Sequence, residues 1–280
     1  TVRNGNAQAR IVAARALAAI RSEQGIRTLI EALSDSEPVV RRQIVESLQF
    51  VGMRAVPFLI EATSSPNTET VHLAARALGN LIGYLDEDQH EILGPLLKDE
   101  RTLEAGLTAL GAVGTGEAAA TLRQFLSHPR WPVRERAAAS LVTIGARSIP
   151  VLDEALKAKN GDEQFWATRA ACWLLIRVGE PVLELVLRAL RSGEKDLALE
   201  AIRTLGEFKH PRVIAALVES FGSPVWVVRA EASEALCRLG KEAMDSLSNV
   251  MKTTDNRDVH YWARKTVRRI KQSLPNSENW

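Results

Sequence analysis

Hydrophobic and polar residues recur along the chain with a period near 31 residues. Segments such as ARALAAI, ARALGNL, TALGAVG and EALCRLG share one phase, and each contains an apolar anchor residue. Successive anchors are separated by 31, 30, 32, 31, 34, 30, 31 and 31 residues; they are Leu17, Leu48, Leu78, Leu110, Leu141, Leu175, Leu205, Leu236 and Val267. A fixed period of this length is typical of repeat architectures built from one supersecondary unit.

Two further columns of residues follow the same register. Four residues before the anchor, every residue except Ile44 is small: Ala13, Ala74, Gly106, Ala137, Ala171, Ala201, Ala232 and Ala263. Three residues after the anchor, every residue is apolar. Positions −4, 0 and +3 share one stripe of a helix with 3.6 residues per turn. The pattern therefore predicts an amphipathic helix in each unit, with a small column that lets a neighbouring helix approach closely.

A shorter amphipathic segment precedes each anchored helix, as in GIRTLIEAL, AVPFLIEAT and RVIAALVESF. Glycines are expected to cap the anchored helices at Gly52, Gly83, Gly114, Gly145, Gly179 and Gly240. Prolines are expected near helix starts at Pro38, Pro132 and Pro224. No segment shows the alternation of apolar and polar residues that is typical of a β-strand. The prediction is an all-α, right-handed α-solenoid, or superhelix, of about eight helical hairpins plus an unpaired N-terminal helix.

The repeat predicts one domain over residues 1–280, with a polar tail at 275–280. Its units are 1–21, 22–52, 53–83, 84–114, 115–145, 146–179, 180–208, 209–240 and 241–274. The sixth unit is longer because it contains the insertion KAKNGDEQ at 157–164, which is expected to form a longer loop.

A helical pair of this length that ends in ALGxxG, with Val-Arg opening its second helix, resembles the HEAT repeat. The Val-Arg pairs are Val40–Arg41, Val133–Arg134 and Val228–Arg229, and Arg10 is in phase with them. The short, alanine-rich units are most similar to the HEAT-like subgroup named after phycobilisome lyases. The resemblance implies that these arginines have a structural role and meet an acidic residue of a neighbouring turn, with Asp35 as the expected partner of Arg41. It also implies that the second helices line a concave surface that holds partners.

Charge is nearly balanced over the whole chain, with 36 basic and 34 acidic residues. The face of the anchored helices opposite the core stripe is different. Positions −6, −2 and +2 together carry nine basic and five acidic residues, and the excess lies in the C-terminal half. There Trp173 is expected on the same exposed face as Arg169 and Arg177, with Arg203 on the next helix. The candidate partner-binding residues are Arg169, Trp173, Arg177, Arg203, Arg238 and Arg269.

The composition and the spacing of cysteines and histidines indicate the cellular location and the ligands to be expected. Two cysteines, Cys172 and Cys237, cannot form a disulfide framework, which favours a reducing, cytoplasmic location. No apolar run reaches the ~18 to 20 residues of a membrane span, so no membrane partner is expected. The five histidines lack metal-ligand spacing, and neither a metal nor a cofactor is expected. HEAT-repeat deoxyhypusine hydroxylase binds iron through several His-Glu pairs, whereas this sequence has only His90-Glu91.

The sequence predicts a non-catalytic scaffold or adaptor that binds an acidic or amphipathic protein segment, with no catalytic residue. Nucleic-acid binding is a second, less favoured reading, and it includes a HEAT-like DNA glycosylase that Trp173, Arg177, Arg203 and Glu207 resemble loosely. A bilin lyase subunit or maturation factor is a third, compatible with the subgroup resemblance.

Overall fold

The computed structural model describes residues 5–82 and 93–273. Every regular element in these ranges is helical, which confirms the all-α prediction. The chain divides into two compact units, Thr1–Val151 and Leu152–Trp280, each described here by itself. The single domain predicted over 1–280 stays a prediction. The predicted cap Gly83 and the predicted tail 275–280 lie outside the described residues.

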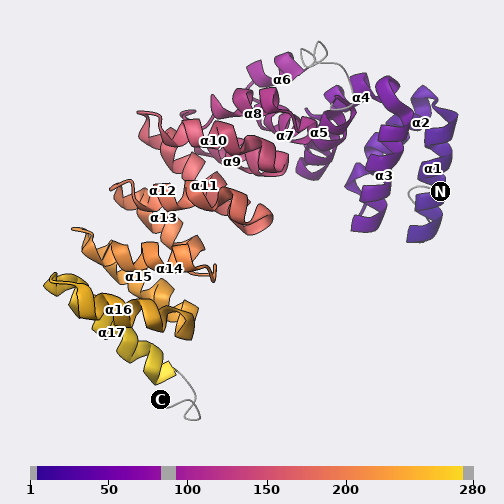
Figure 1. Ribbon diagram of the computed structural model, residues 1–280. Helices are drawn as coiled ribbons and strands as arrows, with labels where there is room; N and C mark the ends of the chain where they lie inside the picture. Colours follow the sequence, from indigo (N-terminus) through magenta and orange to yellow (C-terminus); the bar gives the residue numbers. More distant parts are fainter. Residues whose placement is uncertain (1–4, 83–92, 274–280) are drawn as a thin grey trace. The chain divides into compact units, whose positions relative to one another are not determined.

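The first unit contains five longer helices that pack side by side in chain order (Figure 1). They are α1 (Ala7–Ile20), α3 (Pro38–Val51), α5 (Thr68–Ile82), α7 (Leu103–Val113) and α9 (Trp131–Ile144). Shorter helices precede all of them except α1 and pack against the longer helix that follows: α2 (Glu23–Glu31), α4 (Val56–Ala62), α6 (Gly94–Lys98) and α8 (Gly116–Arg123). The helices of each pair fall within one predicted unit.

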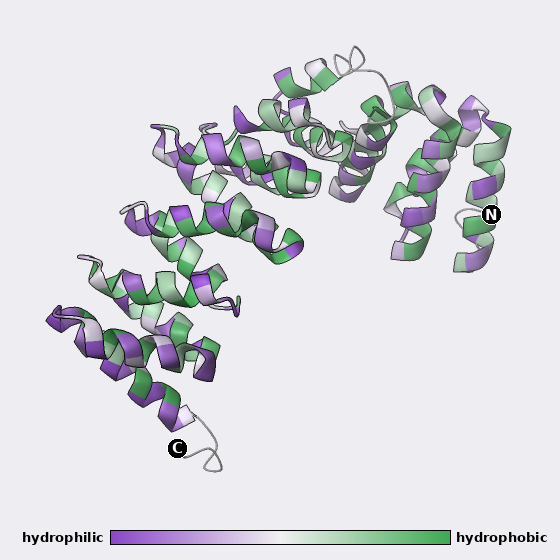
Figure 2. Ribbon diagram, in the orientation of Figure 1, coloured by the Kyte–Doolittle hydropathy of each residue, from purple (hydrophilic) through white to green (hydrophobic). Residues whose placement is uncertain are grey.

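The second unit repeats this arrangement. Its longer helices α11 (Gly161–Val178), α13 (Lys195–Leu205), α15 (Trp226–Leu239) and α17 (Arg257–Ser273) pack in sequence. Its shorter helices are α12 (Leu183–Leu190), α14 (Pro211–Glu219) and α16 (Met244–Thr253), and α10 (Ile149–Leu156) spans the boundary between the units. Hydrophilic and hydrophobic residues alternate along these helices in Figure 2, as one buried and one exposed side require.

Glycine ends the longer helices where the sequence predicts it. Gly52, Gly114, Gly145, Gly179 and Gly240 have φ values of 68° to 82°, a backbone region that other residues rarely adopt. Short 3₁₀ helices at Gly52–Ala55, Gly145–Ser148 and Gly240–Ala243 then lead directly into the next shorter helix. The caps therefore set the tight turn between consecutive hairpins.

The prediction of a longer loop at 157–164 is wrong, because the insertion mainly lengthens a helix. Helix α11 begins at Gly161, fourteen residues before its anchor, whereas α3, α9 and α15 begin ten residues before theirs. The side chain of Asn160 accepts a hydrogen bond from the Glu163 backbone N–H at 3.1 Å. Asp162 and Glu163 also place negative charge in the first turn. An N-cap and acidic first-turn residues both stabilise a helix start, so the extra residues form an additional turn.

The small column lies in the core as predicted. Ala74, Ala137, Ala171 and Ala201 are completely buried, and so is Ile44, the one large residue of the column. Gly79, next to the anchor of α5, shows how close the longer helices come. A Cβ atom at Gly79 would collide with the carbonyl oxygen of Ala109 in α7. Helix α1 is the exception, since Ala13 is only partly buried and Ile20 is 66% exposed.

The expected ion pair between Arg41 and Asp35 is not formed, and that prediction is wrong. The Asp35 carboxylate instead binds Arg10 of the preceding longer helix, with an Nε–Oδ2 distance of 2.8 Å. Arg41 donates to the Asp35 backbone carbonyl at 2.8 Å and pairs with Glu69 of the next longer helix at 3.0 Å. The acidic partner comes from the following hairpin because the turn before each longer helix offers its backbone carbonyl to that helix's own arginine.

The other Val-Arg arginines bind backbone carbonyls in the same way. Arg134 donates to the carbonyl oxygen of His128 at 3.2 Å, and Arg229 donates to that of Ser223 at 2.7 Å. Like Asp35, both acceptors lie six residues before the arginine. The arginines therefore tie each longer helix to the turn that precedes it.

We predict that Ala171→Leu and Ala201→Leu each lower the free energy of unfolding by about 1 to 3 kcal/mol, because a larger side chain overpacks a completely buried site. Chemical denaturation measures this change. The matched control Ala215→Leu, at an exposed position of α14, should change stability by less than about 0.5 kcal/mol. Equal effects at all three positions would contradict close packing in the small column.

Candidate functional site

The predicted exposed face of the longer helices exists in both units. We define the longer-helix face as the residues at positions −6, −2 and +2 relative to each anchor. None of these residues is buried in either unit, in agreement with the prediction. The face is therefore open for contact, while the binding role of its residues stays a prediction.

Arg169 and Trp173 are brought together on α11. The Arg169 guanidinium carbon lies 5.3 Å from the centre of the Trp173 ring and 5.4 Å from that of the Trp166 ring. Trp166 is almost completely buried, whereas Trp173 is half-buried. These distances allow cation–π attraction to both indoles, which restricts Arg169 to one orientation on the face.

Glu200 of α13 joins Arg169 to Arg203, and sequence reasoning missed it. Its carboxylate lies 3.7 Å from the Arg169 Nε and 3.9 Å from an Arg203 Nη. Glu200 stands five residues before its anchor, next to but outside the three columns used for the prediction. Including the residues adjacent to each exposed column would have found it. Two guanidinium groups therefore share one carboxylate here.

The remaining arginines of the site lie on the same face. Arg238 pairs with Glu207 at 3.2 Å, and Arg269 of α17 pairs with Glu234 of α15 at 2.6 Å. Arg177 is exposed near the end of α11. Ion pairs in water contribute little to stability. Their effect here is to neutralise part of the positive charge, so the surplus is smaller than the count of arginines suggests.

The tryptophans near helix starts divide between core and surface. In the second unit Trp262 is buried, and its ring centre lies 6.5 Å from that of Trp226, which is 62% exposed. Trp131 in the first unit is 52% exposed. Some of these tryptophans therefore pack in the core, while others are exposed on the surface.

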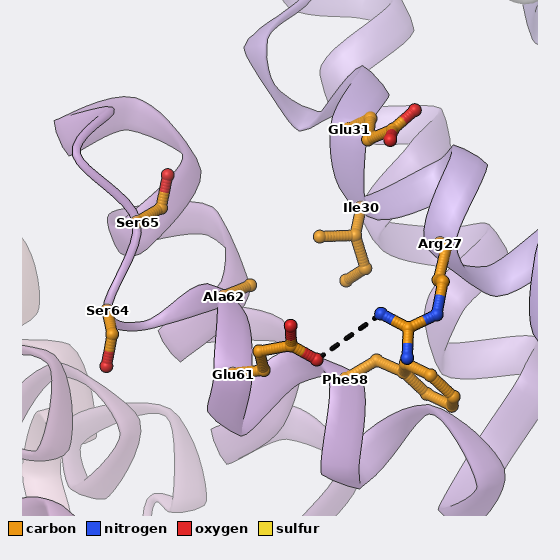
Figure 3. Close-up of a pocket in the computed structure, with 8 residues that line it drawn as sticks. All are labelled: Arg27, Ile30, Glu31, Phe58, Glu61, Ala62, Ser64 and Ser65. Atoms are coloured by element: carbon orange, nitrogen blue, oxygen red, sulfur yellow. Dashed lines mark hydrogen bonds and ion pairs between the residues drawn. The ribbon is translucent and has the colours of Figure 1, made fainter.

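The shorter helices of the first unit form a pocket that sequence reasoning also missed (Figure 3). It lies between α2 and α4 and has a volume of about 470 Å³. Arg27 stacks over the Phe58 ring at 4.8 Å and approaches Glu61 at 3.4 Å, so its charge is already paired within the pocket. The alternation of apolar and charged residues on the shorter helices could have indicated this pocket.

Residues 5–82 and 93–273 contain no cluster of three or more side chains that could hold a metal ion. His90-Glu91 lies outside these ranges. Among the residues that loosely resemble a DNA glycosylase, the Glu207 carboxylate forms an ion pair with Arg238.

None of the described helices combines the length and the apolarity needed to cross a membrane.

Comparison with models of protein families identifies repeats along most of the sequence. A sequence-family profile described as HEAT repeats matches residues 1–79, 91–172 and 182–268. No curated protein matches the chain. The finer resemblance to the phycobilisome-lyase subgroup stays a prediction.

Solved structures match the chain over most of its length, with low sequence identity and TM-scores below 0.5. An engineered protein is 19% identical, with coverage of 96% of this chain and 87% of that one and a TM-score of 0.36. Human deoxyhypusine hydroxylase in complex with glycerol is 20% identical, with coverage of 91% and 99% and a TM-score of 0.34. A structure of Kap95p with RanGDP is 15% identical, with coverage of 93% of this chain but 41% of that one and a TM-score of 0.47. None of these transfers a function to this chain.

The two cysteines differ in environment, which leads to a test of their chemistry. Burial raises the pKa of the Cys172 thiol to about 12, and its Sγ lies 3.7 Å from the backbone carbonyl oxygen of Glu200. Burial also raises the pKa of Cys237, which is only partly buried. Cys172 is therefore a core residue, whereas Cys237 is partly accessible.

We predict that iodoacetamide at pH 8 modifies Cys237 in the folded chain and leaves Cys172 unmodified. A thiol with a pKa of about 12 is ionised in only roughly one molecule in ten thousand at this pH, and burial also blocks access. Peptide mass spectrometry measures both sites, and both should react in denaturant. Equally fast modification of Cys172 in the folded chain would contradict its burial.

Proposed function

The chain belongs to the HEAT-repeat family, and on this basis we propose that it is a non-catalytic scaffold that binds an acidic or amphipathic protein segment on its longer-helix face. Stacked repeats suit this task because each unit contacts only its neighbours, which leaves a long continuous surface for a partner. A cytoplasmic location is part of the same proposal.

One observation carries the proposal. In the second unit Arg169 and Arg203 share the single carboxylate of Glu200. A carboxylate from a partner would complete this arrangement, because charge-assisted hydrogen bonds to guanidinium groups are stronger than neutral ones. The half-buried ring of Trp173 lies beside them and offers apolar contact. An amphipathic segment with acidic residues on one side matches both features.

We predict that the triple variant Arg169→Glu, Arg177→Glu and Arg203→Glu binds its partner roughly 100-fold more weakly, because reversed charges repel an acidic segment. Partners captured from the native lysate by the unmodified chain would be identified, purified and titrated by calorimetry. A matched triple variant at exposed arginines of the first unit, Arg54→Glu, Arg101→Glu and Arg147→Glu, makes the same change in net charge. It should bind normally. Unchanged binding by the first variant would reject this face as the site.

Nucleic-acid binding is a second candidate, and helix α17 favours it. Six basic residues accompany one acidic residue in this helix: Arg257, Arg264, Lys265, Arg268, Arg269 and Lys271 against Asp258. All six are exposed. Phosphate binding by such residues releases counterions and weakens steeply with salt.

If α17 binds duplex DNA, we predict that Arg264→Ala and Arg268→Ala each reduce the slope of log affinity against log salt by roughly 0.9. Fluorescence anisotropy with a labelled duplex measures this slope, and Arg54→Ala serves as the control. Failure of the unmodified chain to bind duplex DNA at low salt would remove this candidate.

A further inference from the structure

A groove opens on the longer-helix face of the first unit, between α1 and α3. We define the α1–α3 groove by Arg15, Ala18 and Ala19 of α1 and Glu46, Ser47 and Phe50 of α3. Ala18 and Ser47 form its floor, since they are 1% and 3% exposed, whereas Ala19 and Phe50 are exposed apolar walls. The groove has a volume of about 290 Å³. Pockets for small molecules usually exceed about 300 Å³, so this groove suits one side chain of a partner.

The Ser47 hydroxyl in the floor of the groove is buried without a hydrogen-bond partner. Within residues 5–82 and 93–273, no group donates to its oxygen or accepts from it. The completely buried Thr266, at the same position −1 of α17, is different. Its hydroxyl donates to the Trp262 carbonyl oxygen at 2.8 Å and shares a hydrogen bond with Ser233 at 2.7 Å. Because an unpaired buried hydroxyl is unfavourable, Ser47 offers a hydrogen bond to a ligand that enters the groove.

Packing of the longer helices does not require a hydroxyl at position −1. Helices α5 and α7 have alanine there, and both Ala77 and Ala109 are completely buried. A methyl group is thus sufficient for close contact at this position, and the extra oxygen of Ser47 has no role in packing. A serine side chain has three staggered rotamers, so its hydroxyl can turn toward a ligand in the groove.

The rim of the groove carries one charge of each sign. Arg15 donates to the side-chain oxygen of Gln43 at 2.7 Å, and Glu46 is exposed on α3. One guanidinium group and one carboxylate give the rim no net charge. The rim therefore favours a neutral group over an acidic or a basic one.

The Phe50 side chain is an apolar wall held in a defined place. The Arg21 guanidinium carbon lies 5.1 Å from the centre of the Phe50 ring, and Arg21 also donates to the Phe50 carbonyl oxygen at 3.1 Å. The ring is nevertheless 62% exposed. An aromatic side chain that enters the groove would cover this exposed surface, and aromatic pairs attract one another beyond the burial of area.

We propose that the α1–α3 groove binds a tyrosine side chain of the partner segment, with its ring on Phe50 and its hydroxyl on Ser47. The hydroxyl of tyrosine both donates and accepts, so it can pair with Ser47 whichever way the serine proton points. The indole N–H of tryptophan only donates, and phenylalanine would leave Ser47 unpaired. This inference rests on the proposed function and deepens it, because it names a residue on the apolar side of the amphipathic segment.

The test compares two probes that differ by one hydroxyl, N-acetyltyrosinamide and N-acetylphenylalaninamide, on the full chain. NMR titration follows the methyl signals of Ala18 and Ala19, which line the groove. The tyrosine probe should bind roughly tenfold more tightly than the phenylalanine probe, because only the tyrosine probe can pair with the Ser47 hydroxyl. N-acetyltryptophanamide should also bind more weakly than the tyrosine probe.

Three variants assign the binding to the groove. Ser47→Ala should give the tyrosine and phenylalanine probes equal affinities without lowering the melting temperature, because the hydroxyl it removes has no partner in the free chain. Phe50→Ala should weaken both probes roughly tenfold, because it removes the aromatic wall. Phe58→Ala is the matched control and should change neither affinity, since Phe58 also lies against an arginine in a pocket of the same unit.

Equal affinities of the unmodified chain for the tyrosine and phenylalanine probes would overturn the proposal. So would tighter binding of the tryptophan probe, a preference for tyrosine that survives Ser47→Ala, or loss of binding in Phe58→Ala. A lower melting temperature of Ser47→Ala would also overturn it, because the hydroxyl would then already have a partner.

The triple variant Arg169→Glu, Arg177→Glu and Arg203→Glu keeps the groove, and it should bind the tyrosine probe as the unmodified chain does. This holds whether or not the variant loses its protein partner. Failure of the proposed function at these arginines is therefore distinguished from failure of the tyrosine site.

Discussion

Close contact between consecutive longer helices at a glycine is the constraint on which the packing of α5 with α7, α7 with α9 and α13 with α15 depends. Close-packed interiors leave almost no spare volume, so a single methyl group decides whether two helices can meet. At Gly79 and Gly111 the next helix comes so close that even a Cβ would have to displace it, and at Gly206 a Cβ would meet the Arg238 guanidinium and lie 3.1 Å from the Ala235 Cβ. The −4 column makes a different contact, since a Cβ added at Gly106 would meet Leu96 and Leu97 of α6, the shorter helix of the same hairpin. The packing of consecutive longer helices also sets the separation of the exposed side chains on the longer-helix face, about 8 to 10 Å from one helix to the next.

That separation explains the pattern of charge on the face. Ion pairs join residues of successive hairpins, as between Arg169 and Glu200 or Arg269 and Glu234, because long side chains can just span neighbouring helices. Such exposed pairs add little stability, yet they hold each guanidinium group in a defined place. An acidic partner must then compete with the resident glutamates. The affinity of the partner would depend on positions where arginine and lysine side chains outnumber the neighbouring glutamates. In the second unit the clearest such position is Glu200, which is shared by Arg169 and Arg203.

The period of small and apolar residues was enough to predict the helices, their glycine caps, the buried column and the exposed face, since these depend on local conformation and on a repeated contact. The errors have a different origin. The 157–164 insertion lengthened α11, and did not form the loop expected of an insertion between repeats, because the Asn160 side chain caps the start of the helix. The Asp35 carboxylate pairs with Arg10 and not with Arg41. Which arginine it reaches depends on how neighbouring hairpins pack, and the sequence of one repeat unit does not show this. Glu200 was missed because the prediction used only positions −6, −2 and +2, whereas the exposed face of a helix also includes residues beside these positions.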